Sequence, residues 1–343
     1  MPQQAPFATQ TAASAVELRH LTKHYTQLQR TGAAADVLRN LIKPRRRIVT
    51  ALNDVSLRVE RGEFLAYAGA NGAGKSTTIK IMSGILRPTE GEVRILGLDP
   101  VRSRLELMSR IGVLFGQRTE LWWDHPVSVS FQWKQAVWDI PRDRYERMKA
   151  VVSELLDLGP LMSTFARELS LGQRMRADLG LLLLHEPELI LLDEPTLGLD
   201  VLAKRQVIDF LKALNREQGT TVIVTSHDMD DLEEMARRIV LLSDGIIAFD
   251  GGFEELRHTV GGLRRLQLTT ESEAAPALTT ATHLRSDGIV HEYEFDLKHT
   301  PVRAVFAEAS QACGIRDIEV RRVSIEHIIA GLYQTWRKES REG

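Results

Sequence analysis

Short apolar runs alternate with stretches of helical periodicity along most of this chain. Nearly continuous apolar runs occur at residues 64–68, 111–115, 189–192 and 221–225, and glycine or polar residues bound each of them. Between two of these runs, apolar side chains recur every three or four residues through positions 207–214. Apolar strands separated by helices are typical of a parallel sheet covered on both faces. The pattern therefore predicts an α/β core whose ligands bind at the carboxyl ends of its strands.

Three other regions have a different pattern. Residues 16–21 and 57–59 alternate between apolar and polar, which predicts antiparallel strands ahead of the core. The region from about 118 to 168 has helical periodicity only. Beyond about residue 251, short alternating strands, a Ser-Asp-Gly turn and two amphipathic helices predict a small α+β domain.

These patterns predict the following organisation. The chain has a disordered lead-in at 1–15, a main domain at 16–251 with an insertion at 26–50 and a helical subdomain at about 118–168, a C-terminal α+β accessory domain at 252–336, and a charged tail at 337–343.

Composition narrows the function classes. The formal net charge of the 343 residues is −2, so no basic field favours a nucleic-acid partner. The single cysteine, Cys313, excludes an internal disulfide framework and suits a reducing compartment. No apolar run approaches the ~20 residues of a membrane span, and residues 1–13 lack the layout of a signal peptide.

Residues 69–77 read Gly-Ala-Asn-Gly-Ala-Gly-Lys-Ser-Thr, which is the P-loop spacing. An apolar strand precedes the loop and a helical segment at 78–82 follows it, as the motif requires. Glycines let successive backbone N–H groups turn inward, and a helix N-terminus adds partial positive charge. Lys75 would reach the outer phosphates and the Ser76 hydroxyl would ligate magnesium. The loop therefore predicts a nucleoside triphosphate site.

Polar residues at three other strand ends complete a candidate site. Asp193 follows an apolar strand, where a magnesium-binding carboxylate belongs, and Glu194 beside it could orient or deprotonate the attacking water. Gln117 has a side-chain oxygen suited to magnesium and a nearby water, although such a residue alone is more often structural. His227 could contact the γ-phosphate as a neutral donor, although a lone histidine is usually a packed or surface residue.

Two further motifs, Leu-Ser-Leu-Gly-Gln at 169–173 and Gly-Leu-Asp at 198–200, follow in order. With the P-loop and the strand-end residues, they resemble the ATP-binding subunits of ABC transporters over about residues 16–251. That resemblance implies a P-loop NTPase fold, in which a RecA-like parallel sheet core carries an antiparallel β subdomain and a helical subdomain. It also implies an ATPase that uses ATP and Mg²⁺.

The resemblance assigns roles by position. The nucleotide contacts would be Tyr25, Gly69, Asn71, Gly72, Ala73, Gly74, Lys75, Ser76, Thr77, Ser170, Gly172, Gln173 and Asp200. The magnesium ligands would be Ser76, Gln117 and Asp193, and the catalytic residues would be Glu194, His227 and Gln117. Tyr25 would stack on adenine; alternatively it is a half-buried strand residue.

In the resembling family, two subunits sandwich two ATPs head to tail, so each site pairs one P-loop with the other subunit's signature motif. Here Ser170 would begin a helix, and its hydroxyl and the Gly172 N–H would bind the partner's γ-phosphate. Leu171 replaces the family's usual first glycine, and a leucine cannot adopt a positive φ cheaply. The predicted assembly is a homodimer, or a pair with a related ATPase.

The stretches at 114–127, 169–179 and 193–201 look like those of bacterial drug and viologen exporters. This likeness implies export, a separate multi-span permease and a cytoplasmic position on the inner face of the membrane. Trp122 and Trp123 are candidate permease contacts, or alternatively subdomain core. The insertion could touch permease or lipid through Arg45, Arg46 and Arg47, or be a solvated basic loop. The C-terminal domain resembles an exporter accessory domain for dimerisation or regulation.

The sequence supports two alternative functions less well. A soluble ABC-type ATPase acting on nucleic acid or ribosomes usually has two cassettes in one chain or a long coiled coil, and this chain has one cassette and no such heptad run. A module that binds ATP without turnover would not need an intact Lys75, Asp193, Glu194 and His227.

Overall fold

The computed structural model describes residues 14–28, 46–116, 118–259 and 262–323. The chain divides into two compact units, Met1–Asp250 and Gly251–Gly343. Several predictions lie outside the described residues: the lead-in up to residue 13, most of the insertion, Gln117, and the last helix and tail beyond residue 323.

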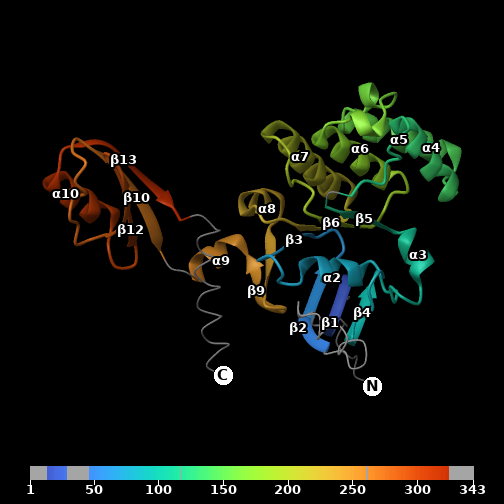
Figure 1. Cartoon of the computed structure of the whole chain (residues 1–343), viewed down its shortest axis with the longest axis horizontal. Helices are drawn as coiled ribbons and strands as arrows, with labels where there is room; N and C mark the ends of the chain where they lie inside the picture. The colour runs from blue at the N-terminus through green and yellow to red at the C-terminus, as the bar shows by residue number, and fades with distance from the viewer. Residues whose placement is uncertain (1–13, 29–45, 117, 260–261, 324–343) are drawn as a thin grey trace, which may run out of the picture. The chain divides into compact units, whose positions relative to one another are not determined.

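A six-stranded sheet forms the centre of the first unit (Figure 1). Its strands lie in the order β5 (Ile111–Phe115), β6 (Leu189–Asp193), β7 (Thr221–Thr225), β3 (Phe64–Gly69), β8 (Arg238–Ser243) and β9 (Ile246–Gly252). The first five pair in parallel, and every side chain of β3, β6 and β7 is buried. Continuous burial explains the continuous apolar runs in the sequence. The register sets Asp193 opposite both Phe115 and Thr225, so the carboxyl ends of three strands meet.

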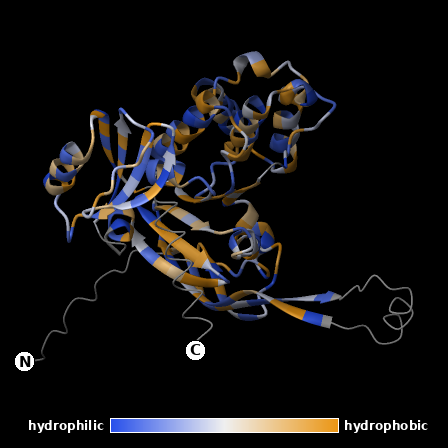
Figure 2. Ribbon diagram, turned by 60° about the vertical axis from the view of Figure 1, so that its left-hand side comes forward, coloured by the Kyte–Doolittle hydropathy of each residue, from blue (hydrophilic) through white to orange (hydrophobic). Residues whose placement is uncertain are grey.

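A three-stranded antiparallel sheet forms the predicted β subdomain. Its order is β2 (Arg46–Glu60), β1 (Ser14–Leu28) and β4 (Glu90–Ile95). The predicted bounds were wrong here, because β1 begins within the expected lead-in and pairing continues into the expected insertion as far as Leu28 and Arg46. The ends of these two strands run out from the sheet (Figure 2). Hairpin pairing satisfies the backbone N–H and C=O groups of these strand ends without burying alternate side chains. The sequence of the strand ends therefore shows no alternation of apolar and polar residues.

Helices surround the central sheet. The P-loop helix α2 (Lys75–Met82) begins three residues earlier than predicted, and the short α3 (Arg104–Met108) precedes β5. The helical subdomain comprises α4 (Val127–Val137), α5 (Arg142–Leu155), 3₁₀ turns at Gly159–Leu161 and Ala166–Glu168, and α6 (Leu171–Leu183). Helix α6 also packs on β5 and on α7 (Val201–Gln218), while α8 (Met229–Met235) packs on α7. Among the described residues, no helix combines the length and the apolar character needed to cross a membrane.

The second unit has its own core. Helix α9 (Phe253–Thr259) opens it, followed by an antiparallel sheet in the order β11 (Thr282–Asp287), β12 (Val290–Asp296), β10 (Leu263–Thr270) and β13 (Ile315–Arg322). Helix α10 (Val302–Ala312) supplies Val305 and Ala309 to a core with Leu266, Leu268, Tyr293 and Phe295. The turn at Gly288 joins β11 to β12, as the Ser-Asp-Gly signal predicts.

Gly112 sets how closely α6 approaches β5. A Cβ added at Gly112 would lie 2.4 Å from Leu182 Cδ2 and 2.8 Å from its Cγ. We therefore expect Gly112→Ala to lower the free energy of unfolding by about 1–3 kcal/mol through overpacking. Denaturant unfolding of the full chain measures this. Gly159→Ala is the control, because a Cβ there meets no atom within 4 Å. Equal stability of the two variants would contradict the close packing.

Candidate nucleotide-binding and active site

The P-loop is wound tightly onto the start of α2. Gly74, with φ 113°, is the N-cap of the helix, and a Cβ there would lie 2.6 Å from Ala51 O. Gly72 has φ 83°. The Ala73 N–H donates to Ala70 O at 3.0 Å, which closes the loop just before the helix. Positive φ angles at these two glycines let the loop turn onto the N-terminus of α2, and backbone N–H groups at a helix N-terminus can bind phosphate.

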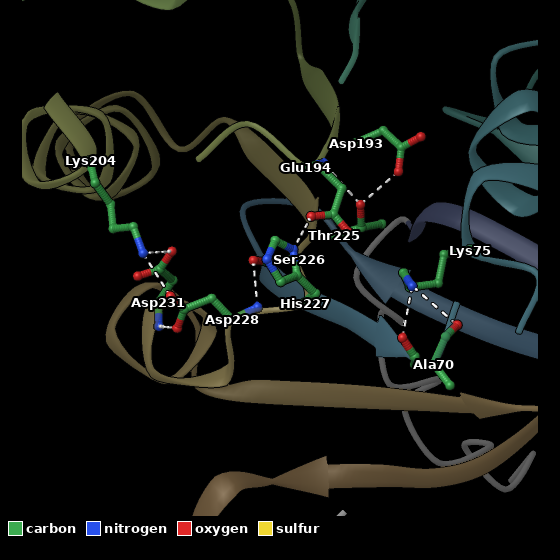
Figure 3. A network of polar contacts seen from close by, with 11 residues as sticks. Ala70, Lys75, Asp193, Glu194, Lys204, Thr225, Ser226, His227, Asp228 and Asp231 are labelled. Carbon is green, nitrogen blue, oxygen red and sulfur yellow. Dashed lines mark hydrogen bonds and ion pairs between the residues drawn. The ribbon is translucent and has the colours of Figure 1, made fainter. Parts of the chain in front are cut away.

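Lys75 occupies the centre of this site (Figure 3). Its side chain is buried, and Nζ donates to the carbonyl oxygens of Gly69 at 2.7 Å and Ala70 at 3.3 Å. Burial lowers the pKa of Lys75, while the negative charges of Glu194 and Asp193 act in the opposite direction. The amine therefore lies in the electrostatic field of both carboxylates, although these come from a strand more than a hundred residues away.

Thr225 joins the ends of β6 and β7. Its hydroxyl donates to Asp193 Oδ1 at 2.7 Å, and the Glu194 N–H donates to both Thr225 Oγ1 and Thr225 O at 3.1 Å. Glu194 has φ 59°, so the chain turns sharply directly after Asp193. The sequence prediction missed Thr225; the available signal was a polar residue at the carboxyl end of an apolar strand.

Glu194 and His227 are paired. Glu194 Oε2 lies 2.6 Å from His227 Nδ1, and the imidazole is more exposed than the carboxylate. A carboxylate in this position accepts from Nδ1–H, so a neutral ring then has an unprotonated Nε2. The predicted role of His227 as a neutral donor to phosphate therefore requires the ring to release Glu194 first.

Magnesium would be held by Ser76 and Asp193 among the described residues. A hydroxyl in the first turn of α2 and a carboxylate are hard oxygen donors of the kind magnesium takes together with phosphate and water. The described residues contain no cluster of three or more His, Cys, Asp and Glu side chains that could enclose a metal. The donor set thus fits an ion completed by nucleotide and water. The third predicted ligand, Gln117, lies outside the described residues.

The signature motif starts α6 with a capping box. Ser170 Oγ accepts from the Gln173 N–H at 3.2 Å, and Gln173 Oε1 accepts from the Ser170 N–H at 2.9 Å. Leu171 is the first helical residue and does not have a positive φ, so leucine causes no backbone strain here. A Cβ added at Gly172 would lie 2.7 Å from Ala203 Cβ, which makes glycine necessary for this approach to α7.

Asp200 and Tyr25, two further predicted nucleotide contacts, make different local contacts. Asp200 is the N-cap of α7, and its Oδ1 accepts from the Ala203 N–H at 2.8 Å. The Tyr25 hydroxyl lies 3.4 Å from Thr77 Oγ1, which brings this half-buried ring beside the first turn of α2. Asn71 is exposed in the P-loop.

Lys204, one turn into α7, connects the helix after Asp200 with the turn after His227. Its Nζ lies 2.6 Å from Asp228 Oδ2 and 3.1 Å from Asp231 Oδ2 (Figure 3). Asp228 is also the N-cap of α8, where it accepts from the Asp231 N–H at 3.2 Å. The sequence prediction missed this ion pair, because Lys204 and Asp228 are 24 positions apart.

Comparisons with known proteins identify the family of this chain. The ABC transporter family model matches residues 52–197. The ABC transporter ATP-binding protein NatA of Bacillus subtilis is 30% identical over 212 residues, covering 62% of this chain and 86% of NatA. The methionine import ATP-binding protein MetN of Carboxydothermus hydrogenoformans is 30% identical over 212 residues, covering 61% of this chain and 63% of MetN.

A solved structure is also similar. The ATP-binding cassette MJ0796, in a dimeric post-hydrolysis state bound to ADP and Pi, has a TM-score of 0.58 and 26% identity, covering 69% of this chain and 98% of that one. The chain belongs to the ATP-binding proteins of ABC transporters. It is an ATPase whose cofactors are ATP and Mg²⁺.

Thr225→Val tests the link between strands. The change keeps the shape of the side chain but removes the hydroxyl contacts to Asp193 and Glu194. We expect kcat for ATP hydrolysis to fall roughly tenfold or more, because hydrogen bonds to charged groups contribute about 1.5–3 kcal/mol. Thr225→Ser should retain most of the activity, and steady-state ATPase assays measure both.

The matched control is Thr221→Val, at the other end of β7. It removes a 2.9 Å hydrogen bond from the Gly62 N–H, far along the strand from Asp193. We expect this control to keep kcat. Wild-type kcat and magnesium dependence in Thr225→Val would show that the hydroxyl does not position the carboxylates.

Proposed function

We propose that this chain works as one of two cassettes that hydrolyse ATP to drive a separate membrane permease, and that the transporter is an exporter. The observation that carries the proposal is the 2.6 Å contact between Glu194 and His227, directly after a buried Asp193. A carboxylate beside the metal ligand is placed to orient or accept a proton from the attacking water. The contact with His227 fixes the carboxylate until ATP binds.

The remaining residues take roles around the nucleotide. The Lys75 amine would exchange its P-loop carbonyls for phosphate oxygens, and the Tyr25 ring would stack on the base. Ser76, Asp193 and Gln117 would hold magnesium. When bound, magnesium neutralises charge that develops on the transferred phosphoryl group.

Two chains would complete each other's sites. The start of α6 carries an exposed Ser170 and, two residues further on, the Gly172 N–H, which together would form a place for an anion. A γ-phosphate bound to the partner's P-loop is that anion. The dimeric solved structure at 26% identity supports this arrangement. The pair is a homodimer or a combination with a related ATPase.

An exposed aromatic cluster is the proposed permease contact. Trp122, Trp123 and Trp133 are 39%, 48% and 40% exposed, and the rings of Trp122 and Trp133 lie 5.5 Å apart. Their exposure counts against the alternative that Trp122 and Trp123 are subdomain core. Exposed tryptophans in a group are typical of protein interfaces. Docking there would hold the cassette on the cytoplasmic face of the membrane.

The direction of transport is the most specific part of the proposal. Export is supported by the likeness of residues 114–127, 169–179 and 193–201 to exporter ATPases. A methionine import protein is nevertheless among the relatives at 30% identity. Reconstitution of the purified transporter in vesicles decides between them. With ATP supplied only outside, where cassettes face the bath, an exporter concentrates its substrate inside the vesicle, and an importer empties it.

Glu194→Gln tests the catalytic assignment. The amide keeps the size of the side chain but cannot accept a proton from water, so we expect kcat to fall roughly a hundredfold or more with ATP binding retained. Steady-state hydrolysis and nucleotide-binding titrations measure the two effects. Glu106→Gln, on an exposed turn of α3, is the control and should hydrolyse ATP normally. Hydrolysis at the wild-type rate by Glu194→Gln would show that another residue orients the water.

The permease is tested by co-purification from native membranes. Tagged Glu194→Gln chain with Mg-ATP should retain a polytopic membrane protein, and adding Trp122→Ala and Trp123→Ala should reduce its recovery roughly tenfold or more. Leu105→Ala, which removes an exposed apolar side chain on α3, should not. If only ribosomes, nucleic acid or soluble proteins are recovered, the proposed transport function is wrong and a soluble ABC-type ATPase is favoured.

A further inference from the structure

We propose that Asp178 is a positioning residue that fastens the turn leaving the nucleotide site to the signature helix, so that the two move together during ATP hydrolysis. The inference rests on the proposed pairing of the signature motif with a partner's ATP. Asp178 carries none of the motif roles assigned above.

The contacts of Asp178 are specific and buried. Its side chain lies in the middle of α6 with only 5% of the residue exposed. Asp178 Oδ1 accepts from Thr119 Oγ1 at 2.9 Å and from the Glu120 N–H at 3.0 Å. The Leu121 N–H in turn donates to Thr119 Oγ1 at 3.1 Å. One carboxylate oxygen thus holds a three-residue turn against the helix.

The same turn begins at the active site. The Gly116 N–H donates to Asp193 O at 2.7 Å, and Phe115 is the register partner of Asp193. Three positions later, the chain reaches Thr119 and is bound to α6. The chain is therefore bonded to the backbone of Asp193 at Gly116 and to α6 at Thr119. Asp178 itself lies eight residues, about two helical turns, after Ser170 at the start of α6.

Two further contacts keep the turn rigid beyond Asp178. The Arg174 guanidinium lies over the Trp123 ring, with its carbon 4.6 Å from the centroid. The buried Lys134 of α4 lies 3.0 Å from Glu120 Oε2 and 4.5 Å from the Trp138 centroid. The turn is consequently held between α6 and α4, and one end of it carries the proposed permease contact.

The chemistry of the contact distinguishes geometry from charge. Burial raises the pKa of Asp178 to about 7, with hydrogen bonds from Thr119 and the Glu120 N–H opposing the rise. Both hydrogen bonds end on the same oxygen, so protonation of the other oxygen leaves the contact intact. An asparagine presents the same carbonyl acceptor. The proposed link therefore needs an acceptor at this position and does not need a negative charge.

The test compares Asp178→Ala with Asp178→Asn in the full-length chain. Asp178→Ala leaves the Glu120 N–H and the Thr119 hydroxyl without their acceptor and frees the turn, so we expect kcat to fall roughly ten- to a hundredfold. The KM for Mg-ATP should stay within about twofold, because Asp178→Ala leaves the proposed nucleotide contacts of the P-loop, Tyr25 and the start of α6 in place. Asp178→Asn should restore kcat to within about threefold of the wild type.

The matched control is His185→Ala. His185 Nε2 contacts Ile111 O at 3.0 Å, which joins the region after α6 to the other end of β5. This control should lower the melting temperature as much as Asp178→Ala does while keeping kcat. Thr119→Val supplies a second probe if Asp178→Ala does not fold, because it removes both hydrogen bonds of Thr119 Oγ1 and leaves the one from the Glu120 N–H to Asp178. We expect Thr119→Val alone to lower kcat. Combined with Asp178→Asn, it should lower kcat no further than it does alone.

The outcomes separate clearly. Normal kcat in Asp178→Ala or in Thr119→Val, or equal kcat losses in Asp178→Ala and His185→Ala, would show that Asp178 only stabilises the fold. Failure of Asp178→Asn to restore kcat would show that the charge matters, and would overturn the proposed link. Absence of ATP hydrolysis in the wild type would instead count against the proposed function, since the comparison rests on that activity.

Discussion

The site depends on the in-register pairing of β6 with β7. Because Asp193 lies opposite Thr225, a single hydroxyl reaches the carboxylate of Asp193 and the N–H of Glu194. That contact accompanies the sharp turn at Glu194, and the turn brings its carboxylate to His227. A slip of one residue would place every side chain of the strand on the opposite face of the sheet. The buried apolar strands therefore fix the geometry of the polar residues that follow them.

Helix α6 connects the site to the surfaces where partners would bind. Its first turn carries the signature motif, its middle holds the turn after β5 through Asp178, and Arg174 lies over the exposed Trp123. Gly172 and Gly112 let this helix approach α7 and β5 closely. A closely packed helix transmits a displacement at one end to its contacts along its length. Helix α6 could thus transmit the closure of the two chains around ATP to a docked permease.

Much of the fold followed from the sequence, because its strands are buried on both faces and its P-loop has a fixed spacing. The predicted α/β core, the antiparallel subdomain and a helix directly after the P-loop all agree with the structure, although α2 begins at Lys75 and not at residue 78. The length of the β1–β2 hairpin did not follow, since its outer pairs are made by polar residues such as Thr26 and Gln27. Thr225, Lys204 and Asp178 were missed for a different reason. Each acts on a partner 24 to 59 positions away, and sequence spacing does not encode such contacts.

The central claim is that each working site is shared between two chains, and complementation of two inactive variants tests it most directly. Lys75→Ala would disable the P-loop and Ser170→Arg would disable the signature motif, so neither should hydrolyse ATP alone. In a mixed dimer, one site would combine the intact P-loop with the intact signature motif. We predict that an equal mixture regains roughly a quarter of the wild-type rate, because half of randomly formed dimers are mixed and each has one complete site. A mixture that stays as inactive as its components would contradict the shared site.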